Sequence, residues 1–161
     1  MQNINVYRSV VSSEIFSEFE AQRGTSLFNH SSNSNFIDDF ISVGYVLCPD
    51  IIDVKGHVFI ADFFNATGVE ALDKLQRLSA QHSNDKKKIE RWVNSWGFGD
   101  FFLGKYNASI ENEKILVQFG ELLVYNWSRR VKDILPDRNI IVEYGEGLIG
   151  EDGLAITLYE A

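Results

Sequence analysis

The chain has 161 residues, of which 45% are hydrophobic and 13% aromatic, so it can bury one substantial core but not two large ones. Its 15 basic and 23 acidic residues give a net charge of −8, which opposes binding to nucleic acid or to an anionic membrane and favours a basic protein as partner. We therefore expect a single domain over residues 1–161.

The start of the chain and its cysteine content bear on the compartment. Residues 1–11 lack the basic start and the continuous apolar run of a secretory signal. No segment approaches the ~18 consecutive apolar residues that span a bilayer. Cys48 is the only cysteine, so no intramolecular disulfide can form, which fits a reducing compartment. These features predict a cytoplasmic protein.

The first third of the chain is predicted to hold a helix and then a loop. Apolar residues at helical spacing over residues 11–19 predict the helix, with Ser9 or Ser12 as its cap and Gly24 as its terminator. Residues 26–35 are rich in Ser and Asn, which predicts a loop that leads into the next helix.

A second helix and a hairpin follow. Apolar spacing over residues 36–47 predicts the helix, which ends before Pro49 because a proline disfavours the α conformation in the residue that precedes it. Residues 51–54 and 58–60 are rich in β-branched and aromatic side chains and flank Gly56. This pattern predicts two strands joined by a tight turn.

Two shorter helices are predicted in the middle of the chain. Thr67 and Glu70 have capping-box spacing, and leucines continue the helical rhythm to Leu78. Residues 84–85 are able to cap a further helix that ends at Gly97. Its apolar residues recur at i, i+3, i+4 and i+7: Ile89, Trp92, Val93 and Trp96. Both indoles of this helix are therefore expected on one face.

The last part of the chain is predicted to form a long helix and a closing hairpin. An apolar stripe over residues 112–135 passes through Trp127, and Pro136 ends the helix. Residues 139–144 and 153–159 have strand composition. The predicted fold is therefore α+β, with a small antiparallel sheet built from hairpins and covered by helices.

Several residues whose side chains are capable of binding or reaction are better explained by packing in the core or by exposure to solvent. Trp92, Trp96 and Trp127 all fit helical apolar stripes, which favours packing over a ligand platform. Cys48 lies at a predicted helix end, where a free cysteine usually behaves as a small buried hydrophobe. Basic residues gather in the two middle helices: Lys74, Arg77, Lys86, Lys87, Lys88 and Arg91. Because acidic residues interleave with them, we favour a solvated face over a nucleic-acid patch.

A glycine-rich segment matches a nucleotide-binding spacing. Gly145, Gly147 and Gly150 have the G-x-G-x-x-G pattern and follow a predicted strand. That mechanism needs a helix N-terminus to receive the pyrophosphate, whereas residues 151–161 have strand character. We therefore interpret the segment as a hairpin loop and predict no cofactor.

No group of residues shows a convincing catalytic arrangement. His57 with Asp50, Asp53 or Asp62 is able to form a mixed metal site if the fold brings them together, but Asp53 and His57 lie beside a tight turn and are close in any case. The adjacent Asp38 and Asp39 point to different sides of a helix, which is poor geometry for joint acid–base work. We predict no catalytic residue and no metal ligand.

Two segments are acidic and contain no Lys or Arg. Residues 139–161 carry Glu143, Glu146, Glu151, Asp152 and Glu160, and residues 24–54 carry Asp38, Asp39, Asp50 and Asp53. Tyrosine is favoured at recognition surfaces, so Tyr144 and Tyr159 are further interface candidates. The predicted partner contacts are Tyr144, Glu146, Glu151 and Asp152, with Asp38 and Asp39 as a secondary patch.

A set of motifs between Phe40 and Tyr159 resembles a known family. The motifs are Cys48-Pro49-Asp50-Ile51-Ile52-Asp53-Val54-x-Gly56-x-Val58-Phe59-Ile60, Ile89-Glu90-Arg91-x-Val93-Asn94, Asp100-x-Phe102, Trp127, Leu135-Pro136-Asp137-Arg138 and Thr157-x-Tyr159. They are similar to those of small, acidic, single-domain bacterial proteins that include immunity proteins encoded beside polymorphic toxins, among them the toxins of contact-dependent growth inhibition. After Asn94 the chain departs from the family pattern, because Ser95, Trp96 and Gly97 stand where similar sequences have a histidine.

The resemblance implies an immunity protein that binds a cognate toxin, such as a basic nuclease, and neutralises it by occlusion through an acidic surface. Two alternatives from other classes remain open. One is a small metal-dependent hydrolase that uses Asp50, Asp53 and His57. The other is an adaptor whose hairpin edge accepts a strand from a partner.

Overall fold

The computed structural model describes residues 5–105, 107–150 and 152–161. Its strands are β1 (Ile51–Val54), β2 (His57–Ile60), β3 (Trp96–Gly97), β4 (Ile140–Glu146) and β5 (Leu154–Glu160). Its α-helices are α1 (Leu27–Ser34), α2 (Ile37–Leu47), α3 (Ala61–Phe64), α4 (Gly68–Gln81), α5 (Lys86–Val93), α6 (Phe98–Phe101) and α7 (Glu113–Ile134). Short 3-10 helices are η1 (Ser13–Glu18), η2 (Ala108–Glu111) and η3 (Leu148–Gly150).

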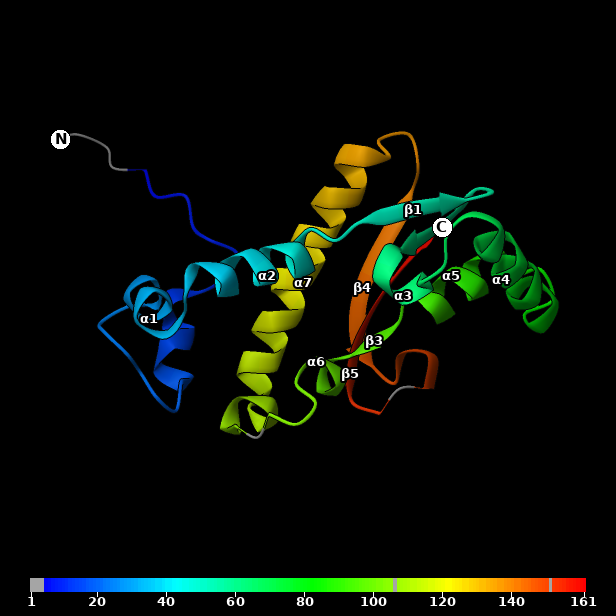
Figure 1. Ribbon diagram of the computed structural model, residues 1–161. Helices are drawn as coiled ribbons and strands as arrows, with labels where there is room; N and C mark the ends of the chain where they lie inside the picture. Colours follow the sequence, from blue (N-terminus) through cyan, green and yellow to red (C-terminus); the bar gives the residue numbers. More distant parts are fainter. Residues whose placement is uncertain (1–4, 106, 151) are drawn as a thin grey trace.

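The described strands form two small antiparallel sheets with helices packed around them, which confirms the predicted α+β fold (Figure 1). One sheet has the order β3-β5-β4, and its main hairpin pairs Ile140 with Glu160 and Glu146 with Leu154. The other sheet is the β1–β2 hairpin. Within the described residues, no helix has the length and apolar character needed to cross a membrane.

The β1–β2 hairpin forms where the sequence predicts it. Lys55 and Gly56 both have positive φ, 50° and 83°, as a two-residue hairpin turn that matches the twist of the strands requires. The Gly56 amide also donates a 2.7 Å hydrogen bond to Oδ1 of Asp53. Gly56 therefore has a local role that a residue with a side chain would fill only with strain.

The long predicted helix is also confirmed. The Asn112 side chain caps α7 by accepting hydrogen bonds from the amides of Lys114 and Ile115. The buried residues of α7 form one stripe: Gly120, Leu123, Trp127 and Val131. At Gly120 the helix approaches β4 so closely that a β-carbon would lie 2.6 Å from the Tyr144 ring. The absence of a side chain at position 120 thus lets α7 pack closely against β4, beside which it runs in Figure 1.

Strand β2 lies between two hydrophobic clusters. Its residues Val58 and Ile60 join Trp127, Ile156 and other side chains of α7 and β5. The intervening Phe59 points to the opposite side and joins a second cluster built largely from α3, α4 and α5. Since successive side chains of a strand point to opposite faces, this single strand links the two halves of the core.

Two predictions for the first third of the chain are wrong. The predicted helix over residues 11–19 is only the six-residue 3-10 helix η1, which begins after Ser12. Residues 26–35, predicted as a loop, contain α1, which is capped by the Ser26 side chain. The Asn and Ser side chains of α1 bond to carbonyl groups one turn earlier, as Asn33 does to Asn29, so its polar composition is compatible with an exposed helix.

The prediction that the α5 helix continues to Gly97 is also wrong. Helix α5 ends at Val93, and Trp96 instead enters β3, where it pairs with Ile156. Trp92, which was expected in the core, is 50% exposed. The helix ends at Val93 because the next residue, Asn94, bonds through its side chain with the backbones of β2 and β5.

The structure also tests three local predictions, for Thr67, for Cys48 and for the segment after Gly145. Thr67 precedes α4 as predicted, but its side chain makes no capping hydrogen bond. Cys48, expected to be buried, is exposed. The segment after Gly145 forms η3 and then β5 instead of a helix able to receive a phosphate, as predicted.

Candidate functional site

Helix α2 presents most of its apolar side chains to solvent. We call this region the α2 surface and define it by Phe36, Ile37, Phe40, Ile41 and Val43. Every residue of α2 is described and none of them is buried. Phe40 is 54% exposed and Ile41 is 69% exposed. An apolar area of this kind commonly marks a site of protein–protein contact.

The α2 helix is attached to the rest of the molecule at its C-terminal end. Val46 and Leu47 pack against the core cluster that contains Trp127. The Trp127 indole also donates a 2.9 Å hydrogen bond to the Val46 carbonyl. The attachment leaves the earlier turns of α2 uncovered by the described part of the chain.

Carboxylates border the α2 surface. Asp38 is exposed in the first turn of α2, where the positive end of the helix dipole stabilises it. Asp39 accepts a 2.7 Å hydrogen bond from the Phe36 amide, so it serves as a helix cap and is less free to contact a partner. Farther along, the Tyr45 hydroxyl donates to Asp62 at 2.8 Å, and this hydrogen bond raises the pKa of Tyr45.

The predicted contacts on the closing hairpin fall into three situations. Tyr144 is half-buried against Phe98 and Gly120, so most of its ring is engaged within the fold. Glu146 and Asp152 are exposed at the end of the hairpin. Glu151 lies outside the described residues. Tyr159, the other tyrosine singled out by the sequence, is only 7% exposed, and its burial raises its pKa.

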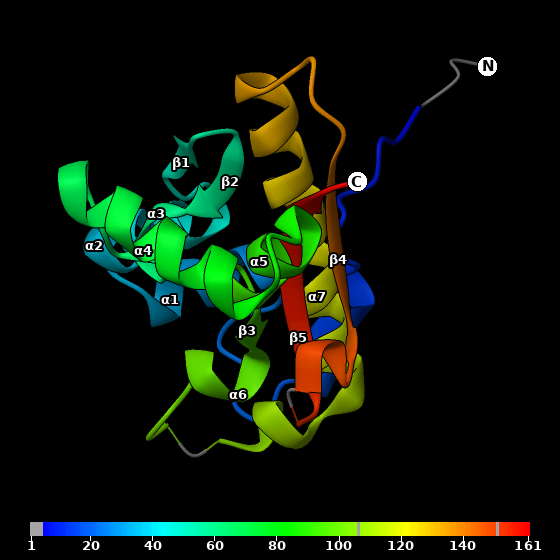
Figure 2. The same ribbon diagram turned by 90° about the vertical axis from the view of Figure 1, so that its right-hand side faces the viewer.

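The structure does not merge the two acidic segments into one patch. Figures 1 and 2 both show the end of the β4–β5 hairpin well away from α2. Two carboxylates of the hairpin are also neutralised internally, because Glu143 pairs with Arg91 at 3.1 Å and Glu160 pairs with Arg138 at 2.6 Å. The acidity of the final hairpin is therefore smaller at the surface than the sequence suggests.

The residues of the hydrolase alternative do not converge. Asp53 pairs with Nη1 of Arg138 at 2.5 Å and also accepts from the Gly56 amide. His57 stacks on Phe59, while Asp50 lies near the Tyr45 hydroxyl. In the described part of the chain, no three His, Cys, Asp or Glu side chains are placed to hold one metal ion.

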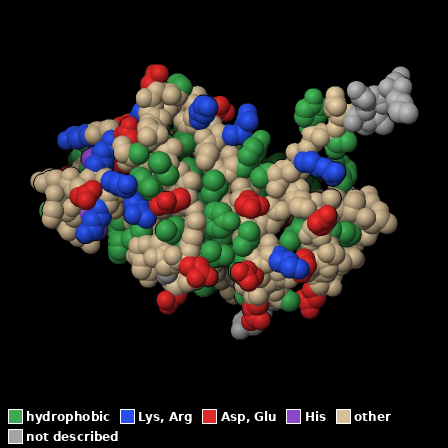
Figure 3. All heavy atoms as spheres, turned by 180° about the vertical axis from the view of Figure 1, so that it is seen from behind, with side chains coloured by type: hydrophobic (Ala, Val, Ile, Leu, Met, Phe, Trp, Pro, Cys, Tyr) green, Lys and Arg blue, Asp and Glu red, His purple; other side chains and the backbone are tan. Residues whose placement is uncertain are grey.

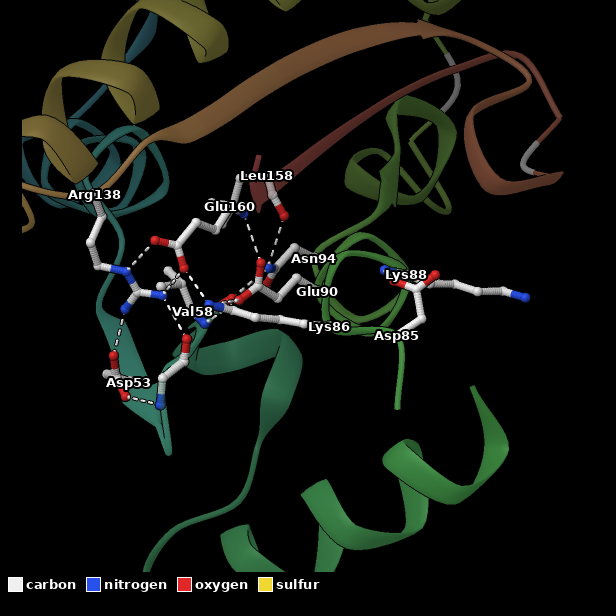
Figure 4. A network of polar contacts seen from close by, with 11 residues as sticks. Asp53, Val58, Asp85, Lys86, Lys88, Glu90, Asn94, Arg138, Leu158 and Glu160 are labelled. Carbon is white, nitrogen blue, oxygen red and sulfur yellow. Dashed lines mark hydrogen bonds and ion pairs between the residues drawn. The ribbon is translucent and has the colours of Figure 1, made fainter. Parts of the chain in front are cut away.

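A buried polar network joins the two sheets, and sequence analysis did not identify it (Figure 4). The fully buried carboxylate of Glu90 accepts hydrogen bonds from the amides of Val58 and Glu160 at 2.9 and 2.7 Å. Four residues later, the buried Asn94 accepts from the Ile60 amide and donates to the carbonyls of Val58 and Leu158. Both side chains thus satisfy backbone groups of β2 and β5, which would otherwise be buried without partners.

An ion cluster extends this network to the surface. Glu160 accepts from Nε and Nη2 of Arg138, at 3.1 and 2.6 Å, and also pairs with Lys86. The hydrogen bonds from Arg138 and then Lys86 lower the pKa of Glu160 to about 2. Arg138 reaches further to Asp53 and to the Gly56 carbonyl, so it ties the end of β5 to the β1–β2 turn.

The only sequence signal for this network is the spacing of Glu90 and Asn94. They are four residues apart, so the sequence places them on one side of the helix and its C-terminal cap, and Glu90 directly follows the buried Ile89. Polar residues at this spacing beside an apolar stripe indicate buried partners, which a sequence alone does not name. The arrangement holds the fold together and shows no access for a substrate, because both side chains are 0% exposed.

Comparison of the chain with protein-family models, with curated proteins and with solved structures finds no match.

Proposed function

We propose that this protein binds a basic protein, most simply a toxin that it neutralises by covering its active surface. The observation that carries the proposal is the α2 surface, where an apolar helix stands exposed beside carboxylates. The resemblance of the sequence motifs to toxin-immunity proteins supports the same function. In this proposal the protein acts by occlusion and needs no chemistry of its own.

Burial of the α2 surface would supply most of the affinity. Phe36, Ile37, Phe40 and Ile41 are exposed by half of their area or more. Removing apolar area from water contributes about 25 cal/mol per Å², and aromatic side chains are frequent anchors at interfaces. An amphipathic helix laid into an apolar groove of the partner is a recurrent mode of recognition.

The acidic residues would determine which partners approach. Residues 24–54 contain no Lys or Arg, so Asp38 and Asp50 have no basic neighbour within that segment, whereas Asp53 pairs with Arg138. Glu146 and Asp152 add negative charge at the far end of the hairpin. Complementary charge speeds encounter with a basic toxin and disfavours acidic proteins.

The test is the association of purified protein with the toxin domain encoded by the adjacent gene. We expect the double variant F40D/I41D to weaken binding by roughly 100-fold or more, since it places two charges in an apolar contact. The matched control is V69D, because Val69 is 74% exposed on α4 and its change has the same chemistry. V69D should bind as the wild type does.

A second variant tests the hairpin. Reversal of Glu146, Glu151 and Asp152 to Lys should lower the association rate at low salt, and the difference should shrink as salt screens charges over about 8–10 Å. Full binding by F40D/I41D would remove the α2 surface from the proposal. Sedimentation of the protein alone shows whether a second copy covers that surface; a stable dimer lost in F40D/I41D would also contradict the proposal.

A further inference from the structure

A cavity lies between the end of α4, one side of α5 and the turn η3. Its volume is about 720 Å³. Its lining includes the basic or aromatic residues Lys87, Lys88, Arg91 and Trp92, and His82, Asp85, Gln81 and Ile149 complete it. A cavity of this volume is in the range of small-molecule sites, which run from about 300 to 1,000 Å³. We call it the basic cavity. Figure 1 shows α4 and α5, which carry most of its lining, at the end of the molecule away from α2.

The charge around the basic cavity is opposite to that of the whole chain. Residues 86–88 place three lysines in the first turn of α5, and that turn contains no acidic residue. Cations at a helix N-terminus are unfavourable, because that end of the helix dipole is positive. Figure 3 shows Lys and Arg side chains gathered at this end of the molecule.

Those cations have few partners within the described residues. Lys86 pairs with Glu160, but neither Lys87 nor Lys88 forms an ion pair with any described carboxylate. Figure 4 shows the Lys88 side chain extended away from the polar network. Asp85 caps α5 through a 3.0 Å bond from the Lys88 amide, so its carboxylate already has a structural role. An anion in the cavity would meet lysines that are not neutralised by described residues.

A buried histidine provides a second, independent indication of a ligand. His82 is 8% exposed and lines the cavity. Its Nε2 atom is buried and has no hydrogen-bond partner among the described residues. Buried polar atoms are normally paired, so an orphaned one beside a cavity indicates a bound group or a water. The Nε atom of Arg91 is likewise buried and has no hydrogen-bond partner among the described residues.

The Trp92 side chain in the lining indicates a ligand that carries a planar ring. Trp92 is 50% exposed, and its ring centre lies 5.6 Å from that of His82. An indole left open beside cations offers a stacking surface for a planar ring, while the lysines suit a phosphate. A long nucleic acid would meet the net charge of −8, whereas a small nucleotide meets only the local field.

We propose that the basic cavity binds a small nucleotide, with its base or ring stacked on Trp92 and its phosphate held by Lys87 and Lys88 beside His82. The Arg91 guanidinium lies 5.2 Å from the Tyr159 ring and pairs with Glu143, so it is held in place beside the site. This inference is independent of the toxin-binding proposal, because it uses none of the residues of the α2 surface.

Calorimetric titration of the full chain at low ionic strength tests the proposal with ATP, AMP, inorganic phosphate and a single-stranded oligonucleotide as probes. We expect ATP to bind more tightly than phosphate. W92L and K88Q should each weaken ATP binding about fivefold or more, because one stacked base or one charge-assisted contact corresponds to at least that factor. Both side chains are at the surface, so an unchanged thermal midpoint verifies the fold of each variant.

Matched controls lie on α7. Y125L removes another half-exposed aromatic side chain, and K132Q removes another exposed cation. Both should bind ATP as the wild type does. The proposal is overturned if ATP fails to bind at millimolar concentration, if Y125L and K132Q weaken binding as much as W92L and K88Q, if phosphate binds as tightly as ATP, or if the oligonucleotide binds more tightly than the mononucleotides.

Discussion

Helices α2 and α5 have opposite compositions and opposite environments. Residues of α2 are mainly apolar, yet none of its described residues is buried. Helix α5 begins with three lysines, yet its Ile89 and Glu90 are both 0% exposed. The comparison shows that position in the fold, and not hydropathy alone, decides what is buried in this protein.

The difference has a physical origin in what each helix meets. Helix α5 lies where β2 and β5 need partners for their backbone groups, and its Glu90 and the following Asn94 supply them. Helix α2 meets the core only at its last turn, through Val46 and Leu47. An exposed apolar helix contributes little to folding, and this exposure is the basis of the proposed partner contact.

The largest expected effect concerns the residue that joins α2 to the core. W127A removes a side chain that is 2% exposed and should lower the free energy of unfolding by about 3–5 kcal/mol. Urea denaturation measures this loss. W127F keeps an aromatic ring but loses the hydrogen bond to the Val46 carbonyl, so it should cost clearly less. Near-wild-type stability of W127A would show that Trp127 is not the central packing residue of α7.

The second largest effect is expected from removal of the buried Glu90 carboxylate of α5. E90A leaves the amides of Val58 and Glu160 without an acceptor, and each such group costs about 1–3 kcal/mol. We therefore expect a loss of about 2–5 kcal/mol in urea denaturation. E90Q retains one carbonyl acceptor and should lose less. If E90A were as stable as the wild type, burial of Glu90 would not stabilise the junction of the two sheets.

A pH effect follows from the ion cluster at the end of β5. The pKa of Glu160 is about 2, below its ordinary value of 4.5, because Arg138 and Lys86 favour the charged form. The stabilisation is therefore fully present above about pH 5 and is lost as the pH falls toward 2. Thermal midpoints measured across this interval should fall less steeply in E160Q. Identical pH profiles for E160Q and the wild type would assign the acid sensitivity to other groups.

The smallest effect on stability is expected on the α2 surface. F40S and I41S change residues that are already more than half exposed, so each should alter the free energy of unfolding by no more than about 0.5 kcal/mol. I89S on α5 is the buried counterpart and should cost several times as much. A loss in F40S or I41S as large as that in I89S would show that the α2 surface is packed in solution.

Signals between neighbouring residues predicted much of the fold. The turn at Gly56, the cap at Asp85, the stripe of α7 and the closing hairpin depend on residues close in sequence, and the structure contains all four. The exposure of Glu146 and Asp152 also follows from nearby residues, since both flank a turn. These features form from short-range hydrogen bonds and periodicity, which a sequence displays directly.

Other features depend on partners far away in the chain. Asn94 leaves α5 because Val58 and Leu158 present carbonyl groups 36 and 64 residues away, and that departure carries Trp96 into β3. Tyr144 turns toward the core because Gly120 leaves room for its ring. From the sequence alone we determined the fold class, the main hairpins and the acidity of the chain. Only the tertiary structure decided which apolar helix stays uncovered and which carboxylates are neutralised, because both depend on the surfaces that the folded chain brings together.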